Sequence, residues 1–260
     1  MDSAECLFRG ELAVRKKGPN DFITRVDLEI SERLCGVLPK LLEKSQVISE
    51  ERKSALTADP YLWIIDPIDG TNSLVYGFPL YAVSIGLVLE KKPVLGVVYL
   101  PALGELFSAA SGCGAFLENT LIPGGAKKPI RVNNDDSLDK ALVMAETDPY
   151  FDRGKNPSME LIRLVYERCV DLRISGSAAV DYSFIAAGRA GAHFCRHLNP
   201  WDYAGGSAIL LEAGGSFSLW DGSPMPFEGK HSSLATNGTL HGEMLEIIGS
   251  FLSASPSAVP

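Results

Sequence analysis

The chain has 260 residues, of which 46% are hydrophobic and 22% are charged, a composition typical of a globular protein with a sizeable core. Its formal net charge of −8 argues against a nucleic-acid-binding protein, because no excess of lysine and arginine is available to follow a phosphate backbone. An acidic protein that handles an anionic substrate needs bound cations to supply positive charge locally.

The cysteines and the apolar runs indicate the cellular compartment in which the protein is expected. Five scattered cysteines form no Cys-x-x-Cys pair, which indicates a reducing compartment and gives no disulfide or zinc framework. The longest apolar runs, such as residues 81–89, are too short to span a bilayer, and the first residues lack the pattern of a secretory signal. We therefore expect a cytoplasmic protein whose partners include neither membranes nor nucleic acids.

The first half of the chain is predicted to combine helices with an antiparallel sheet. Apolar residues recur with a helical period over residues 27–44, where Pro39 is expected to kink or end the helix. After Phe78 the period changes to two, which predicts a meander of antiparallel strands. The expected elements are helical turns within 6–17, a break at 18–20, the helix at 27–44, strands at 46–49, 61–65, 81–89, 94–100, 105–109 and 114–117, and a surface turn at 124–129.

The second half alternates between strands and helices, which favours a sheet covered by helices. The expected strands are 141–145, 171–174, 192–196 and 216–219, the expected helices are 158–169, 178–187 and 202–213, and the tail from Ser253 is expected to fray. A hinge near residues 135–140 is predicted to divide the chain. Residues 1–135 would form an α+β half, and residues 136–260 an α/β half that supplies Asp202 and the substrate pocket.

The most informative segment runs from Trp63 to Ser73. Three apolar residues lead into two acids, Asp66 and Asp69, and a Gly-Thr-Asn-Ser sequence follows. This pattern predicts a buried strand that delivers carboxylates next to the bared N–H groups of a short helix. Because two carboxylates held this close repel each other, a divalent cation is the natural compensation, and a helix start attracts phosphate oxygens. The segment is therefore typical of metal-assisted phosphate chemistry.

Three further acids, Asp27, Glu50 and Asp202, also follow apolar strands or begin helices, where a single acid can simply cap a helix. Their surroundings nevertheless carry a family resemblance. Four segments, in the right order and spread over nearly the whole chain, resemble the motifs of the inositol monophosphatase family, within the lithium-sensitive, magnesium-dependent sugar phosphatases. They are Asp21-Phe22-Ile23-Thr24-Arg25-Val26-Asp27, Ser49-Glu50-Glu51, Trp63-Ile64-Ile65-Asp66-Pro67-Ile68-Asp69-Gly70-Thr71-Asn72, and Trp201-Asp202-Tyr203-Ala204-Gly205-Gly206 continuing to Glu212-Ala213-Gly214-Gly215.

The resemblance implies a layered αβαβα sandwich of the α+β class, a homodimer, lithium sensitivity and two or three Mg²⁺ ions in each active site. One Mg²⁺ would be bound by Glu50, Asp66 and the carbonyl group of Ile68. A second would be bound by Asp66, Asp69 and Asp202, so that Asp66 bridges the two ions. Glu50 would also help to hold a looser third ion.

The resemblance also assigns catalytic and substrate-binding roles. Thr71 and Asp27, together with Glu50, would orient and deprotonate the attacking water. The backbone N–H groups of Gly70 and Thr71 would hold the phosphate. The substrate-binding set implied in this way is Gly70, Thr71, Asn72, Gly176, Ser177, Cys195 and Asp202.

Cys195 is the main departure from the family pattern. Inositol phosphatases generally carry a glutamate seven residues before the acid that matches Asp202, where it hydrogen-bonds the inositol hydroxyls, and this chain has Cys195 there. Because cysteine is a weak hydrogen-bonding group, we expect the pocket to hold inositol poorly and to accept several small phosphomonoesters.

Histidines and lysines outside the motifs carry weaker signals. His193 and His197 flank Cys195, but no second Cys/His cluster supports a zinc site, so we expect these residues to pack or to form a pocket wall. Lys17 and the pair at 127–128 are expected to be solvated, whereas Lys16 occupies a place where the family often keeps a basic residue near the site.

These patterns lead to one main hypothesis, a Mg²⁺-dependent phosphomonoesterase that acts on inositol monophosphate or a related small sugar phosphate. Fructose-1,6-bisphosphate, 3′-phosphoadenosine 5′-phosphate and histidinol phosphate are alternative substrates within the family. A glycosidase that uses two carboxylates is disfavoured, because it needs neither the Gly-Thr helix start nor further acids. A non-catalytic module that binds phosphate or metal remains the alternative if the water-activating residues fail.

Overall fold

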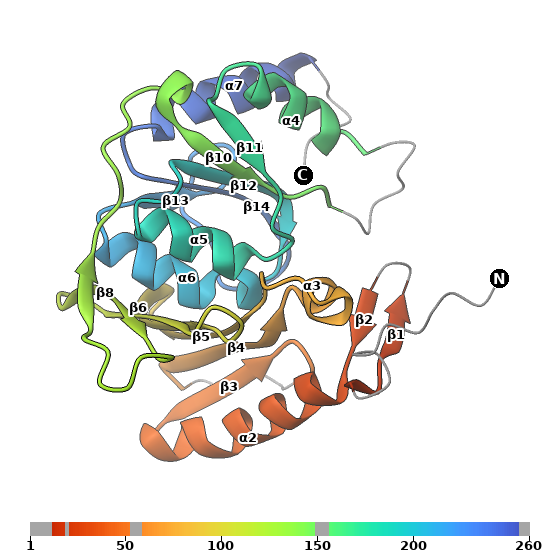
Figure 1. Ribbon diagram of the computed structural model, residues 1–260, viewed down its shortest axis with the longest axis vertical. Coiled ribbons are helices and arrows are strands. Elements are labelled where there is room, and N and C mark those ends of the chain that lie inside the picture. The colour runs from red at the N-terminus through yellow and green to blue at the C-terminus, as the bar shows by residue number, and fades with distance from the viewer. Residues whose placement is uncertain (1–11, 19–20, 53–58, 149–155, 255–260) are drawn as a thin grey trace.

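The computed structural model describes residues 12–18, 21–52, 59–148 and 156–254, and these form five layers in which helices and sheets alternate (Figure 1). Helix α2 (Arg25–Leu41) covers the outer face of a seven-stranded sheet. Helices α5 (Ala178–Ala186) and α6 (Pro200–Glu212) lie between that sheet and a five-stranded sheet. Helices α4 (Ser158–Tyr166) and α7 (His241–Ala254) cover the far face of the second sheet. The predicted αβαβα sandwich is confirmed.

The seven-stranded sheet is antiparallel except for the pairing of its first two strands. Its last strand was not predicted, since the segment reads as a turn rich in glycine and lysine. In spatial order the strands are β3 (Ser45–Ser49), β4 (Tyr61–Asp69), β5 (Ala82–Leu89), β6 (Lys92–Leu100), β7 (Glu105–Ala110), β8 (Gly114–Asn119) and β9 (Lys128–Ile130).

The five-stranded sheet is mixed, with parallel pairing on one side of its central strand β12 and antiparallel pairing on the other. Strand β14 and helix α7 were not predicted, although the buried residues Met244, Ile248 and Phe251 of α7 follow a helical period. In spatial order the strands are β11 (Asp171–Arg173), β10 (Leu142–Ala145), β12 (Ala192–Leu198), β14 (His231–Thr236) and β13 (Ser216–Ser218).

The start of the described chain differs from expectation. Residues 15–17, which were expected to be helical, belong to strand β1 (Arg15–Gly18), which pairs antiparallel with β2 (Asp21–Ile23). Most of the predicted helix at residues 6–17 lies outside the described residues. The division of the chain near residue 135, where a short 3₁₀ turn spans Leu138–Lys140, stays a prediction. No helix in the part of the chain that the structure describes is long and apolar enough to cross a membrane.

Helix α6 is the central element of the sandwich, because it lies directly against the backbone of the first sheet. Gly86 of β5 and Gly96 of β6 are paired in register beneath it. A Cβ atom on Gly96 would lie 2.1 Å from the carbonyl oxygen of Gly205 in α6, and a Cβ atom on Gly86 would lie 2.7 Å from the Cβ atom of Ala204. Helix and sheet can therefore approach this closely only because glycine occupies these positions.

We expect the Gly96→Ala substitution to destabilise the protein by about 3 kcal/mol or more, because its methyl group would force α6 away from the sheet. Gly249→Ala in α7 is a matched control, since the site is exposed and a Cβ atom there meets nothing within 4 Å. The control should stabilise α7 by up to about 1 kcal/mol through helix propensity. Urea unfolding followed by circular dichroism measures both changes. Equal stabilities of the Gly96→Ala variant and the unmodified protein would contradict the packing described here.

Candidate active site

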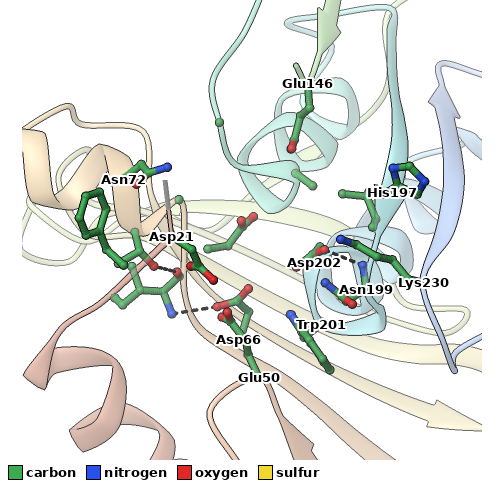
Figure 2. A pocket seen from close by; sticks show the side chains of 18 of the residues that line it. Asp21, Glu50, Asp66, Asn72, Glu146, His197, Asn199, Trp201, Asp202 and Lys230 are labelled. Atoms are coloured by element: carbon green, nitrogen blue, oxygen red, sulfur yellow. Dashed lines mark hydrogen bonds between the residues drawn. The ribbon is translucent and has the colours of Figure 1, made fainter. Parts of the chain in front are cut away.

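A cavity of about 400 Å³ opens where strand ends and helix starts from both sheets meet (Figure 2). The ends of β4, β10 and β12 and the first residues of α3 (Thr71–Tyr76), α5 and α6 contribute to its wall. The hairpin β1–β2 closes one side through Gly18, Asp21 and Phe22. Since these elements converge here, residues far apart in the sequence share one polar cavity.

Strand β4 carries the first two acids of the site. Its pairing with β5 shifts register between Asp66, which faces Ser84, and Asp69, which faces Ala82. Residues three apart on a regular strand point to opposite faces, but one extra residue returns the second side chain to the same face. The backbone N–H of Ile68 donates to Oδ1 of Asp66 over 3.0 Å within this irregular segment. The bulge therefore explains how both carboxylates reach the cavity.

The third acid comes from the start of α6. Asp202 is the third residue of the helix, and its Oδ2 accepts the backbone N–H of Asn199 over 2.7 Å, which forms a capping box. Oδ2 of Asp69 accepts the hydroxyl of Ser177 over 2.8 Å and the N–H of Ala179 over 2.6 Å at the start of α5. Asp66, Asp69 and Asp202 each bring one oxygen into a group whose atoms all lie within 4.8 Å of one another.

Burial and mutual repulsion dominate the electrostatics of this group, which we name the three-aspartate group (Asp66, Asp69 and Asp202). Burial, followed by the charges of Glu50, Asp69 and Asp202, raises the pKa of Asp66 well above its usual range. Burial raises the pKa of Asp69 to about 6, although its hydrogen bonds from Ala179 and Ser177 act in the opposite direction. Burial and the Asp69 charge likewise raise the pKa of Asp202. A divalent cation would relieve this repulsion, and an all-oxygen donor set fits a hard ion such as Mg²⁺.

Glu50 lines the same cavity directly after β3, but it lies outside the three-aspartate group. Its Oε1 accepts Nζ of Lys17 over 2.9 Å, and Lys17 also contacts Glu51. Lys17 is exposed, as expected, but the β1–β2 hairpin also turns its side chain towards the two glutamates, which was not expected. Burial opposes the charge of Lys17, but the two glutamates raise its pKa and keep it cationic.

Thr71 connects the site to the start of α2. Its Oγ1 lies 2.9 Å from the carbonyl oxygen of Ile68 and 3.2 Å from Oδ1 of Asp27, so the hydroxyl can donate to either. Asp27 is buried, and its Oδ2 accepts the backbone N–H of Thr24 over 2.9 Å as well as the hydroxyl of Thr24. This capping box fixes Asp27 and therefore fixes the oxygen that faces Thr71.

The expected substrate-binding residues divide into two sets. Gly70, Asn72 and Gly176 line the cavity beside Thr71 and Asp202. Ser177 does not line it; its side chain caps α5 and holds Asp69.

Cys195 also lies away from the cavity wall. Its side chain is 2% exposed and belongs to the hydrophobic core, and its Sγ lies 3.7 Å from the carbonyl oxygen of His197. The register shift of β12 between Cys195 and Leu198 explains the difference, since it places His197 and Leu198 on the wall instead.

Other side chains also line the cavity, among them His197, for which packing or a place in the pocket wall was expected, and Glu146 and Lys230, to which no role was assigned. Glu146 follows β10, His197 lies near the end of β12 in contact with Asp148, and Lys230 precedes β14. Figure 2 shows Glu146 on the far side of the cavity from Glu50 and Asp66. Glu146 carried a usable signal, because an acid directly after a predicted strand is the pattern that singled out Glu50 and Asp66. Lys230 had none, since it lies in an irregular segment.

Comparison with known proteins places this architecture among characterised relatives. A model described as the inositol monophosphatase family matches residues 3–251. An inositol-1-monophosphatase of Synechocystis is 34% identical over 239 residues, which cover 90% of this chain and 79% of the relative. A fructose-1,6-bisphosphatase/inositol-1-monophosphatase of Aquifex aeolicus is 32% identical over 239 residues, covering 92% and 86%. The solved structure of a Thermotoga maritima IMPase matches with a TM-score of 0.80 and 29% identity, covering 93% of this chain and 89% of that one.

The pKa of Asp66 predicts a pH dependence of stability for the metal-free protein. Because its pKa in the folded state lies above the value of about 4 in an unfolded chain, the folded state holds the proton more tightly. The contribution of Asp66 to the free energy of unfolding therefore falls as the pH rises from about 4 through the raised pKa. In chelator at pH 7, Asp66→Asn should melt at a higher temperature than the unmodified protein, and this difference should vanish near pH 4.

Thermal melts with and without Mg²⁺ complete that test. Mg²⁺ should raise the melting temperature of the unmodified protein and should do so much less for Asp66→Asn, because binding to the folded state alone stabilises it. Asp136→Asn is the control, since its ion pair with Lys140 is exposed. A lower melting temperature for Asp66→Asn in chelator at pH 7 would contradict the repulsion described above.

Proposed function

The chain belongs to the inositol monophosphatase family, and we propose that it is a Mg²⁺-dependent phosphatase that hydrolyses small phosphorylated polyols and sugars. The observation that carries this proposal is the three-aspartate group on the wall of the cavity. Thr71 lines the same cavity, and Asp27 lies within hydrogen-bonding distance of Thr71. A phosphate ester is repelled by so many acids unless cations are bound between them. The site therefore fits a substrate that enters together with divalent metal ions.

The metal ligands proposed are those that the family resemblance implies. Asp66, Asp69 and Asp202 would hold one Mg²⁺, while Glu50, Asp66 and the carbonyl group of Ile68 would hold another. When bound, the metal lowers the pKa of a coordinated water and stabilises negative charge on the phosphoryl and leaving oxygens. Lys17 already neutralises part of the Glu50 charge. The number of ions, up to a looser third one near Glu50, is part of the proposal.

Thr71 and Asp27 are proposed to prepare the attacking water. Because the Thr71 hydroxyl donates its own hydrogen to Asp27 or to the Ile68 carbonyl group, its oxygen lone pairs remain available to accept a hydrogen bond from a water in the cavity. Asp27 stays fixed through Thr24, so this acceptor of the Thr71 hydroxyl keeps its position. Glu50, across the site, would accept the proton of that water. The phosphate would lie against the backbone N–H groups of Gly70 and Thr71.

Substrate selectivity is proposed to reside on the wall formed by Glu146, His197 and Lys230 rather than at Cys195. A cavity of about 400 Å³ admits one small metabolite. Relatives are named for inositol-1-phosphate and fructose-1,6-bisphosphate activities, and we propose that this chain accepts several such phosphomonoesters. Sensitivity to Li⁺ and assembly as a homodimer belong to the same proposal.

Phosphate release from a panel of phosphomonoesters tests the proposed activity. The purified protein is stripped with a chelator and assayed, with and without Mg²⁺, on inositol 1-phosphate, fructose-1,6-bisphosphate, 3′-phosphoadenosine 5′-phosphate and histidinol phosphate. We expect turnover only with Mg²⁺, on more than one polyol or sugar phosphate, and a loss of about 100-fold or more in Asp202→Asn, because a carboxylate ligand is missing. Phosphate binding without turnover of any ester would instead indicate a non-catalytic binding module.

The role of Thr71 is tested separately from metal binding. Thr71→Ala removes the hydroxyl and leaves every proposed carboxylate ligand in place, so kcat should fall by roughly 100-fold or more while the Mg²⁺ concentration for half-maximal activity changes little. Thr71→Ser is the matched control, because it keeps the hydroxyl and should retain most of the activity. Parallel losses of rate and Mg²⁺ affinity in Thr71→Ala would make Thr71 a structural cap.

A further inference from the structure

A second group of potential metal ligands lies beside the cavity, apart from the three-aspartate group. It consists of Glu146 after β10, Asp181 in the first turn of α5 and His193 in β12, and we name it the Glu-Asp-His group. Nε2 of His193 lies 3.6 Å from Oδ2 of Asp181 and 4.0 Å from Oε1 of Glu146. One ligand atom from each residue lies within 4.8 Å of the other two.

The polar side-chain atoms of Asp181 and His193 are buried without hydrogen bonds from the described residues around them. The side chains of Asp181 and His193 are fully buried. Among the described residues, neither carboxylate oxygen of Asp181 and neither ring nitrogen of His193 has a hydrogen-bond partner. Buried polar groups are normally paired, and each unpaired one costs about 1–3 kcal/mol. Three of these atoms, Nε2 of His193 and the two carboxylate oxygens of Asp181, belong to groups that face each other and that one bound ligand could pair.

The residue types of the group point to a cation as that ligand, since two carboxyl groups and an imidazole nitrogen within 4.8 Å of one another are all metal-ligating groups. Burial, followed by the charges of Asp69 and Asp181, raises the pKa of Glu146 well above its usual range. Burial raises the pKa of Asp181 in the same way, and the nearby Ser175 hydroxyl donates its hydrogen to the carbonyl oxygen of Ser177 rather than to Asp181. Burial lowers the pKa of His193 to about 3, so the imidazole is neutral. Two buried acids next to a neutral imidazole form a donor set without positive charge.

The donor chemistry distinguishes this group from the three-aspartate group. Metal ligands at about 2.0–2.2 Å from an ion lie roughly 3–4.3 Å from one another, which matches the two measured separations. An imidazole nitrogen with carboxylates suits a borderline cation such as Zn²⁺, whereas oxygen ligands alone suit Mg²⁺. We propose that Glu146, Asp181 and His193 form a second metal site, selective for Zn²⁺ or a similar first-row transition-metal ion over Mg²⁺.

The position of Glu146 gives this site access to the substrate cavity. Glu146 lines the cavity, whereas Asp181 and His193 lie behind it. Three protein ligands leave a coordination position open in a tetrahedral ion, and here that position can face the cavity. An ion held there would fix the Glu146 side chain and offer a binding point for a substrate oxygen away from the phosphate. His193, which we expected only to pack or to form a wall, lies in a tilted ring contact with Tyr182 and presents Nε2 to the acids.

Metal binding to the complete protein tests the proposal directly. Crystals are grown with millimolar Mg²⁺ and then exposed to micromolar Zn²⁺, and anomalous differences are measured on both sides of the zinc absorption edge. We expect a zinc peak among Glu146, Asp181 and His193. In solution, equilibrium dialysis under the same conditions should give one tightly bound Zn²⁺ per chain. A zinc peak only within the three-aspartate group, or no bound Zn²⁺ at all, would overturn the proposal.

Variants show which residues hold the ion. Asp181→Asn keeps the size of the side chain, and Glu146→Gln changes a residue at the cavity edge, so folding can be checked for both by circular dichroism. Each should lower Zn²⁺ affinity by at least about 100-fold, more than the loss of a supporting partner commonly costs. Replacing bound Zn²⁺ by Co²⁺ gives visible absorption bands that should disappear in His193→Gln.

Two matched controls exclude the nearby alternatives. Asp202→Asn removes a buried carboxylate from the three-aspartate group, and Cys195→Ser removes the thiol two residues from His193. Both should keep Zn²⁺ affinity within about threefold of the unmodified protein. Loss of Zn²⁺ in Asp202→Asn together with full binding in Asp181→Asn and Glu146→Gln would show that the ion occupies the three-aspartate group and would refute the second site. None of these measurements depends on phosphatase turnover.

Discussion

The close approach of α6 to the first sheet is the constraint on which the rest of the structure depends. Gly86 and Gly96 bring the sheet backbone against Ala204 and Gly205 with no sheet side chain between them. Asp202 lies one turn earlier in the same helix, so this contact also sets its distance from Asp66 and Asp69 on the neighbouring β4. A small outward movement of α6 would separate the acids that have to share a cation. The packing of the core therefore fixes the electrostatics of the cavity.

The acids at the cavity combine structural with chemical roles. Asp27 and Asp202 each complete a capping box, and Asp69 accepts two hydrogen bonds from the start of α5. These bonds hold the carboxylates in place before any cation arrives. Their repulsion raises the free energy of the metal-free folded state, while the caps lower it. The site is thus preorganised at some expense of stability, as is common where charged groups converge.

Much of this arrangement could be predicted from the sequence, and the exceptions have physical causes. The acids at 66 and 69 were recognisable because a strand followed by a cap has a local pattern, and the motif order indicated the family. The pairing of Lys17 with Glu50 was missed, since the two residues lie 33 positions apart in the sequence and only the β1–β2 hairpin brings them together. Cys195 was misplaced because a bulge changes which residues of β12 face the cavity, and alternation alone cannot reveal a bulge. The Glu-Asp-His group was missed because its three members come from three separate elements.

The parts of the cavity wall differ in how freely they can change during evolution. The wall made by β4 and the start of α6 is tied to glycine contacts and capping boxes, so most substitutions there would disturb the fold together with the chemistry. Other parts of the wall carry Glu146, His197 and Lys230, which lie at or next to strand ends. Substitutions at these three positions would alter the shape and charge of the cavity with little effect on the core. Substrate range can therefore diverge among related chains while the hydrolytic machinery stays the same.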